Sequence, residues 1–324
     1  MKNKPIGGYF ELEKTTHGGN FPQKDGVLLN TGRNALEYIL ASIGNVSKLY
    51  IPFYTCEVVL EPLEKLGIQY EFYHLDTHLE LVNDIDLLED EYLLFTNYFG
   101  VMDSYIMKLA QKYGNKLIVD CAQALYAKHI SGIKTFYSPR KFVGIPDGAV
   151  VYMEGGISPS EFGVDYSDNR MSHLYIRLEH GPQAGYADFR NNAAKLKNLP
   201  ILNMSYKTKE LIENIDFKDI KKTRIQNFQL LHNDLKSTNR FIVPNIETFE
   251  CPMVYPYWTS DKELKSRLIK EQVFVATYWP NVLDWTKEGM IEYEFANCLL
   301  AIPCDQRYCA DDMKRIISLI LNIH

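Results

Sequence analysis

Apolar residues recur along the first half of the chain in two alternating patterns. Some segments have the period of an amphipathic helix, whereas others are short runs of β-branched and aromatic residues. The helical segments are 34–43, 58–66 and 104–113. The strand-like runs are 48–54, 70–75, 92–98, 116–119 and 148–153. This alternation predicts an α/β fold in which helices cover both faces of a mainly parallel sheet.

The pattern changes after residue 205. A charged stretch at 207–236 is predicted to be helix-rich, and the chain ends in an amphipathic helix at 310–321. Between them the sequence predicts strands near 241–243, 253–258 and 273–277 and a helix at 261–271. A chain of 324 residues is long enough for about two domains. We therefore expect a large α/β domain with an N-terminal arm at 1–205 and a smaller α+β domain at 206–324.

Composition narrows the class of function. The chain has 46% hydrophobic and 23% charged residues, which is typical of a globular protein. Its 41 acidic and 35 basic residues give a net charge of −6, whereas nucleic-acid binding needs a basic face. No apolar run approaches the roughly 20 residues that cross a bilayer, and we recognise no signal peptide. We expect a cytoplasmic protein that binds neither nucleic acid nor membrane.

The six cysteines change this picture little. They are sparse, and the close CxxC spacing of a zinc site is absent from the sequence. We therefore expect reduced thiols and no metal site.

Three groups of chemistry-bearing residues stand at the ends of predicted elements. Asp120 follows the strand-like run 116–119, and ligands of α/β proteins bind beyond the carboxyl ends of strands. Ser138 and Lys141 lie on a loop before the run 148–153. The segment 31–34 (TGRN) opens a helix, whose free N–H groups and dipole favour a phosphate. An acid, a lysine and a phosphate cradle are the groups that pyridoxal phosphate (PLP) requires.

Five segments carry a resemblance to a known family. They are 31–36 (TGRNAL), 49–55 (LYIPFYT), 97–100 (NYFG) with Asp103, 119–124 (VDCAQA) and 300–303 (LAIP) with the final helix. The most specific part is the VDCAQA segment followed at a distance by Lys141. Through these motifs the sequence resembles the DegT/StrS family of PLP-dependent nucleotide-sugar aminotransferases. The resemblance implies a fold-type I aminotransferase architecture, with PLP as cofactor.

The resemblance also implies roles around the cofactor ring. Lys141 would form the Schiff base, and Asp120 would pair with the pyridinium nitrogen. Gln123 would contact the hydroxyl side of the ring, and Asn97 takes a position near the ring where the family often has histidine. Cys56 takes the position of the residue that stacks on the ring, which is commonly aromatic.

Further positions follow from the same comparison. Tyr54 is the alternative stacking residue. The phosphate would be held by Gly32, Arg33 and Asn34 together with Ser138. The segment 185–190, which has Asp188 where the family has asparagine, would reach a neighbouring subunit. The resemblance therefore implies a homodimer with active sites at the interface.

The implied activity is amine transfer. The amino group would pass from a donor, glutamate being the expected one, to a keto group of a nucleotide-linked sugar. Two alternatives stay open. One is other PLP chemistry on a related substrate. Relatives that dehydrate sugars have histidine in place of the lysine, so Lys141 argues against a dehydration. The other is a non-catalytic binding or regulatory protein, suggested by Cys56 and Asp188.

Overall fold

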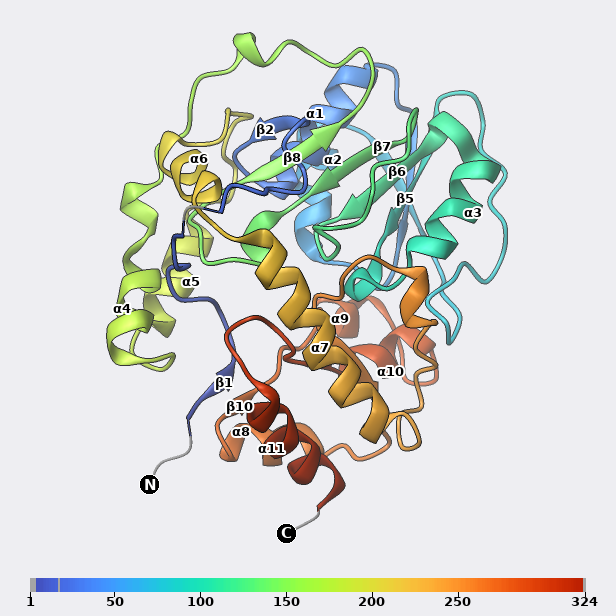
Figure 1. The fold of residues 1–324 in the computed structure, drawn as a ribbon. Helices are drawn as coiled ribbons and strands as arrows, with labels where there is room; N and C mark the ends of the chain where they lie inside the picture. The colour runs from blue at the N-terminus through green and yellow to red at the C-terminus, as the bar shows by residue number, and fades with distance from the viewer. Residues whose placement is uncertain (1–3, 17, 323–324) are drawn as a thin grey trace.

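The computed structural model describes residues 4–16 and 18–322, and a seven-stranded sheet forms its centre (Figure 1). The strand order is β2-β8-β7-β6-β5-β3-β4. The strands are β2 (Val27–Leu29), β3 (Lys48–Pro52), β4 (Gln69–Tyr73), β5 (Glu91–Thr96), β6 (Leu117–Cys121), β7 (Lys134–Tyr137) and β8 (Ala149–Tyr152). Only β8 runs against its two neighbours, β2 and β7. The predicted mainly parallel sheet is confirmed.

The period of two along each strand divides the core between the two faces of the sheet. On one face, Leu94 and Ile118 join a buried cluster with apolar residues of α1 (Gly32–Ile43) and α2 (Leu60–Leu66). On the other face, Leu93 and Phe95 join a larger cluster that includes residues of α3 (Asp103–Tyr113). Both faces are therefore covered, as the alternation of patterns predicted.

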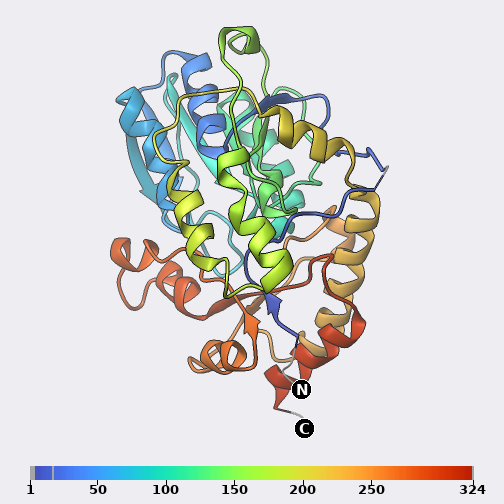
Figure 2. The ribbon, with the colours of Figure 1, turned by 90° about the vertical axis from the view of Figure 1, so that its left-hand side faces the viewer.

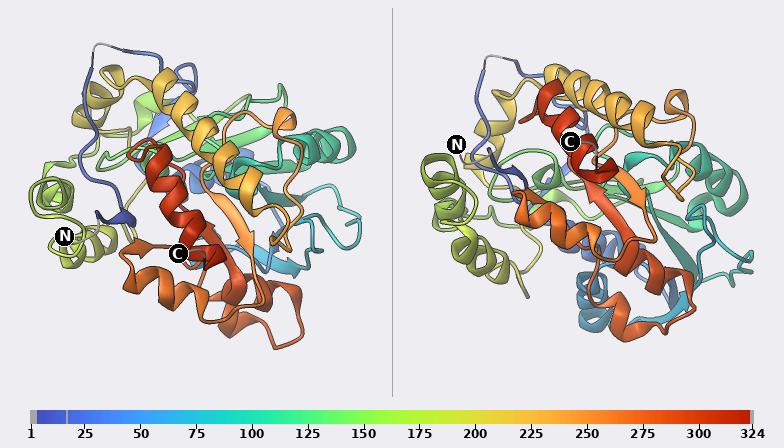
Figure 3. Two further views of the ribbon diagram at one scale, coloured as in Figure 1. Left: turned by 60° about the horizontal axis from the view of Figure 1, so that its bottom comes forward. Right: turned by 90° about the horizontal axis from the view of Figure 1, so that it is seen from below.

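The C-terminal part is built mainly from helices around two small sheets. Helix α7 (Phe217–Leu235) lies beside α11 (Ala310–Leu321), and both run along one side of the molecule (Figure 3). Strand β9 (Tyr255–Trp258) pairs antiparallel with β11 (Leu299–Ile302). Strand β1 (Ile6–Gly7) pairs in parallel with β10 (Val273–Phe274), so the N-terminal segment joins the C-terminal part of the chain.

The remaining helices are short. They are α4 (Ser172–His180), α5 (Tyr186–Ala194), α6 (Tyr206–Glu213), α8 (Leu264–Lys270), α9 (Val282–Trp285) and α10 (Ile291–Cys298). One-turn 3₁₀ helices are η1 (Glu57–Val59), η2 (Tyr98–Gly100), η3 (Gly114–Lys116), η4 (Pro139–Lys141), η5 (Pro159–Glu161), η6 (Asp168–Arg170) and η7 (Ile246–Thr248).

Most predicted elements are present within a few residues, and the final helix has the predicted bounds. The stretch 207–236 is broken into α6 and α7, where the Asp216 side chain accepts from the amides of Lys218 and Asp219 and so caps α7. The strand predicted at 241–243 is wrong. That segment has no regular structure, and Asn239 Oδ1 accepts from the Phe241 amide instead of a neighbouring strand. The domain boundary at 205 stays a prediction.

Three further features bear on function. No helix in the part of the chain that the structure describes has the length and apolar character to cross a membrane. All six cysteines are free. Within residues 4–16 and 18–322, no three side chains of His, Cys, Asp or Glu gather as metal ligands would.

Candidate functional site

Asp120 lies near the carboxyl end of β6, in the middle of the sheet. Its side chain is only 9% exposed, and one carboxylate oxygen, Oδ1, accepts from the Ala122 amide at 2.7 Å. Burial raises the pKa of Asp120 above its usual value, whereas the Lys141 charge and the Ala122 N–H act to lower it. A desolvated carboxylate of this kind is stabilised by a nearby cation.

Lys141 ends the one-turn helix η4, which follows β7. The turn is closed by hydrogen bonds from the Lys141 amide to Ser138 O (3.2 Å) and from the Phe142 amide to Pro139 O (2.8 Å). Among the described residues, no hydrogen bond or ion pair engages the exposed Lys141 Nζ. Its charge acts on both Asp120 and Cys56. The structure therefore places a free amine within electrostatic range of a buried acid and a thiol.

The two candidate stacking residues, Cys56 and Tyr54, lie in different surroundings. Burial raises the pKa of the Cys56 thiol, and the Lys141 charge lowers it, so Cys56 lies within electrostatic range of the lysine. Tyr54 is fully buried in an aromatic cluster, with ring centroids 5.7 Å from Tyr98 and 5.0 Å from Trp279. Tyr54 therefore belongs to the core, and its role as a stacking residue stays a prediction.

Gln123 carries a buried hydrogen-bond donor, Nε2, that has no acceptor among the described residues. The residue is 1% exposed, and its Oε1 accepts from the Phe99 amide at 2.7 Å. Its Nε2 is buried without a partner among the described residues. An unsatisfied buried donor is costly. PLP fits these groups, because its ring hydroxyl oxygen could accept from Gln123 Nε2 while its ring nitrogen faces Asp120.

The predicted phosphate cradle is present in part. A Cβ at Gly32 would lie 3.9 Å from Ser138 Cβ, so the start of α1 and the turn before Lys141 are adjacent. Arg33 Nη1 pairs with Glu61 at 2.6 Å, and Asn34 Nδ2 donates to Leu199 O at 2.8 Å. Both side chains are thus engaged elsewhere. A phosphate here would meet the first amides of α1, which have no intrahelical partner, and the Ser138 hydroxyl.

Arg140 is a residue to which the sequence analysis assigned no role. Burial lowers its pKa to about 10, the Asp147 charge raises it, and the charges of Arg170 and Arg33 lower it further. No ion pair among the described residues includes Arg140. An unpaired cation therefore lies near the cradle. An arginine on a loop is ordinarily a solvated surface residue. Only its position between Ser138 and Lys141 could have pointed to a role for Arg140 in the site.

Asn97 forms structural contacts beside Asp120. Its amide nitrogen donates to Asp120 O at 2.9 Å. Its side-chain Nδ2 donates to Asp103 Oδ1 at 2.6 Å, and its Oδ1 accepts from the Met102 amide at 3.1 Å. The side chain thus braces the start of α3, and contact with a cofactor ring stays a prediction.

Solved structures share this architecture. The chain is similar to DesV of S. venezuelae, solved in complex with a ketimine intermediate, at 16% identity over 92% of this chain and 84% of that one (TM-score 0.64). A DegT DnrJ EryC1 StrS aminotransferase from Brucella abortus matches at 14% identity over 92% and 85% (TM-score 0.61). The E. coli GDP-4-keto-6-deoxy-D-mannose-3-dehydratase with bound hydrated PLP matches at 13% over 93% and 88% (TM-score 0.62).

These similarities concern structure alone. No family model matches the chain, and no curated protein matches it in sequence. Sequence identities of 13% to 16% show the fold alone, so the activity has to be inferred from the residues of the site. The chain has the α/β fold of the sugar aminotransferases, so the predicted fold class is confirmed.

Proposed function

We propose that the chain is a PLP-dependent aminotransferase that moves an amino group from a donor, with glutamate as first candidate, to a keto group of a nucleotide-linked sugar. The observation that carries the proposal is the unengaged Lys141 amine on the turn after β7, a strand whose last residues pair with Asp120 and Cys121 of β6, so that the lysine charge acts on the buried Asp120 carboxylate. The unpaired Gln123 Nε2, in the loop that follows β6, supports it. So do the structures of similar fold, which include sugar aminotransferases and a dehydratase with bound PLP.

Each residue would have a separate task. When bound, PLP supplies a protonated ring that withdraws electrons from the substrate carbon. Asp120 would hold the ring nitrogen, and the positive ring would lower the carboxyl pKa that burial raises. Gln123 Nε2 would donate to the ring hydroxyl oxygen. Lys141 Nζ would bind the aldehyde carbon and, as a free amine, would accept and return the proton.

The phosphate would lie at the start of α1. The first amides of that helix and the Ser138 hydroxyl would donate to it. The Arg140 guanidinium, which forms no ion pair with a described carboxylate, would add a positive charge. The side chains of Arg33 and Asn34 are engaged with Glu61 and Leu199, so Arg33 would contribute through its backbone amide, whereas the Asn34 amide already donates to Thr31 Oγ1 at 3.2 Å.

We also propose a homodimer. Six large apolar side chains are exposed along the segment 164–206, and exposed apolar surface of this kind is used by proteins to contact partners. They are Val164, Tyr166, Tyr175, Leu178, Tyr186 and Tyr206. Helices α4 and α5, which carry three of them, lie against each other on one side of the molecule (Figure 2). The segment 185–190, expected to reach a partner, starts α5, and Asp188 accepts from Ser172 Oγ at 2.8 Å.

The decisive experiment is a half-reaction with glutamate. We expect the purified protein to take up PLP with a visible absorption band, and glutamate to bleach this band while one equivalent of 2-oxoglutarate forms. D-glutamate serves as the control that should leave the band in place. A band that no amino donor changes would favour the alternative that the chain is a non-catalytic binding or regulatory protein. A protein that takes up no PLP would contradict the whole proposal.

A substitution at Gln123 tests the ring contact. In Gln123→Glu one side-chain oxygen can still accept from the Phe99 amide, but the Nε2 donor is lost. We expect PLP affinity to fall by about tenfold, which corresponds to one lost hydrogen bond of about 1.4 kcal/mol. Titration of the visible band measures the change, and thermal unfolding without PLP checks that the variant is folded. Unchanged affinity would place the ring elsewhere.

A further inference from the structure

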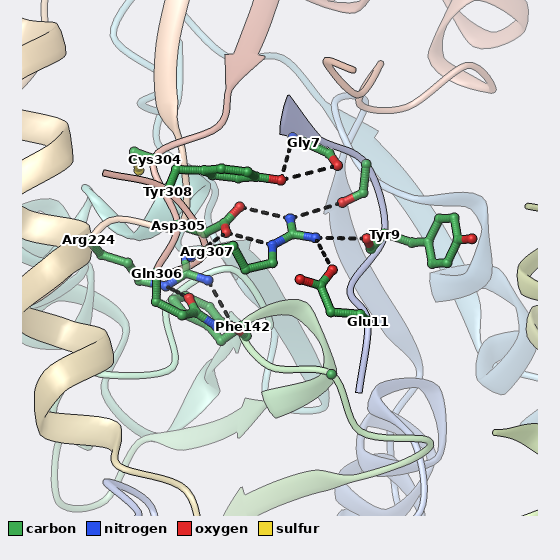
Figure 4. A network of polar contacts seen from close by, with 12 residues as sticks. Gly7, Tyr9, Glu11, Phe142, Arg224, Cys304, Asp305, Gln306, Arg307 and Tyr308 are labelled. Atoms are coloured by element: carbon green, nitrogen blue, oxygen red, sulfur yellow. Dashed lines mark hydrogen bonds and ion pairs between the residues drawn. The ribbon is translucent and has the colours of Figure 1, made fainter. Parts of the chain in front are cut away.

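The main chain next to Lys141 is held by two side chains from the C-terminal part of the chain. Phe142 directly follows Lys141, and its carbonyl oxygen accepts two hydrogen bonds (Figure 4). Arg224 Nη2, from α7, donates at 2.9 Å, and Gln306 Nε2, from the loop between β11 and α11, donates at 2.9 Å. Residues more than 80 positions away thus meet at one atom of the lysine turn.

Arg224 is fully buried and holds several segments at once. Its Nη1 donates to Met253 O at 2.8 Å, its Nε donates to Gln306 Oε1 at 3.0 Å, and its guanidinium lies 4.7 Å from the Phe142 ring centroid. No described carboxylate forms an ion pair with it. An apolar side chain would fill this space without the cost of desolvating a charge. The hydrogen bonds to Met253 O and Phe142 O therefore account for the presence of a buried guanidinium at this position.

Gln306 is fixed in turn by its neighbours. Arg307 binds Asp305 through Nε at 2.7 Å and Nη2 at 2.9 Å, and its Nη1 donates to Tyr9 O at 2.9 Å (Figure 4). These contacts tie the loop that carries Gln306 to the N-terminal arm. The charged cluster thus fixes the loop, and the Gln306 amide is held by its own hydrogen bonds to Arg224, Glu13 and Phe142.

The N-terminal arm holds the other side of the lysine turn. The amide of Gly144 donates to Glu13 Oε2 at 3.3 Å, and the Glu13 amide donates to Gly144 O at 3.0 Å. Gln306 Nε2 donates to the same Glu13 carboxylate at 3.0 Å. A Cβ at Gly144 would lie 1.6 Å from Glu11 O, so only glycine allows this approach. The turn therefore has contacts on both sides.

We infer that Arg224 and Gln306 are positioning residues for Lys141: by holding the Phe142 carbonyl they set where the lysine amine stands relative to Asp120. The inference rests on the proposed function, because it assigns the network to the lysine that would bind PLP. The C-terminal part of the chain then contributes to the site without touching the cofactor. A displacement of about 1 Å at such a site can cost on the order of 100-fold in rate.

The test compares Gln306→Met with Asn227→Ala. Gln306→Met keeps the side-chain length and removes the donor to Phe142 O. Asn227, one turn along α7 from Arg224, donates to Cys304 O and Tyr308 O in the same loop but makes no contact with Phe142, so it is the matched control. PLP is added to protein that holds none, borohydride fixes it, and mass spectrometry measures the rate of labelling at Lys141. Hydrogen exchange of the segment 139–145 is measured without PLP.

We expect Gln306→Met to label Lys141 about tenfold more slowly than wild type and to speed exchange in the segment, whereas Asn227→Ala changes neither. Arg224→Lys, which keeps one donor, should recover part of the labelling that Arg224→Met loses. Wild-type labelling and exchange in Gln306→Met would overturn the inference. Absence of labelling at Lys141 in the wild type would instead overturn the proposed function, so the two failures are distinguishable.

Discussion

Replacement of Lys141 by alanine is expected to abolish amine transfer and the visible band of the PLP-bound protein. The side chain would supply both the covalent link and the group that moves the proton, and general-base catalysis alone contributes roughly 100- to 10,000-fold. Activity should therefore fall by at least this factor. The measurements are single-turnover absorbance with glutamate and borohydride fixation followed by peptide mapping.

The control for this substitution is Lys128→Ala, which removes a lysine that pairs with Glu250 at 2.8 Å at the surface. It should leave the band and the rate unchanged. Lys141→Ala should also remain folded, because no described residue bonds Lys141 Nζ, but it removes the charge that lowers the pKa of the buried Asp120, so thermal unfolding is measured alongside. A borohydride-stable label that persists in Lys141→Ala would show that another amine binds PLP.

Asp120→Asn is expected to weaken PLP binding while making the cofactor-free protein more stable. Asparagine can still accept from the Ala122 amide but carries no charge to hold the ring nitrogen. Loss of a hydrogen bond between charged groups corresponds to about 1.5–3 kcal/mol, or roughly 10- to 150-fold in affinity. Titration of PLP at pH 7 measures this loss.

The effect of Asp120→Asn on stability has a defined pH dependence. Burial raises the carboxyl pKa above the ordinary 3.8, so the folded state binds this proton more tightly than the unfolded state does. The contribution of protonated Asp120 is complete below pH 3.8 and is lost as pH rises through the raised pKa. Without PLP, Asp120→Asn should therefore unfold at a temperature a few degrees higher at pH 7 and should show no gain at pH 3.

Asp103→Asn is the matched control for Asp120→Asn. Burial also raises the pKa of Asp103, but its carboxylate accepts from Asn97 Nδ2 and from the Glu250 amide, away from Lys141. PLP affinity should be unchanged in this variant. Equal losses of affinity in both variants would mean that Asp120 contributes only through the fold.

The sequence by itself determined five of the seven strands of the central sheet, the first three helices, the final helix and the order of the chemical groups, but it gave no sign of β2 and β7. Adjacent strand residues such as Leu93 and Leu94 join opposite faces of the sheet because side chains along a strand have a period of two. The same pattern placed Asp120 at the end of β6, because a carboxylate that ends an apolar run marks the edge of a buried strand. Local patterns are sufficient for features that depend on neighbouring residues.

Only the tertiary structure decided which groups meet. It put Cys56 within range of the Lys141 charge and Tyr54 in the aromatic core, engaged Arg33 with Glu61, and left Arg140 outside every ion pair of the described residues. It also joined Arg224 and Gln306 to the Phe142 carbonyl. Such contacts link residues far apart in the chain, and they depend on how whole elements pack. No pattern within a short window of sequence contains that information.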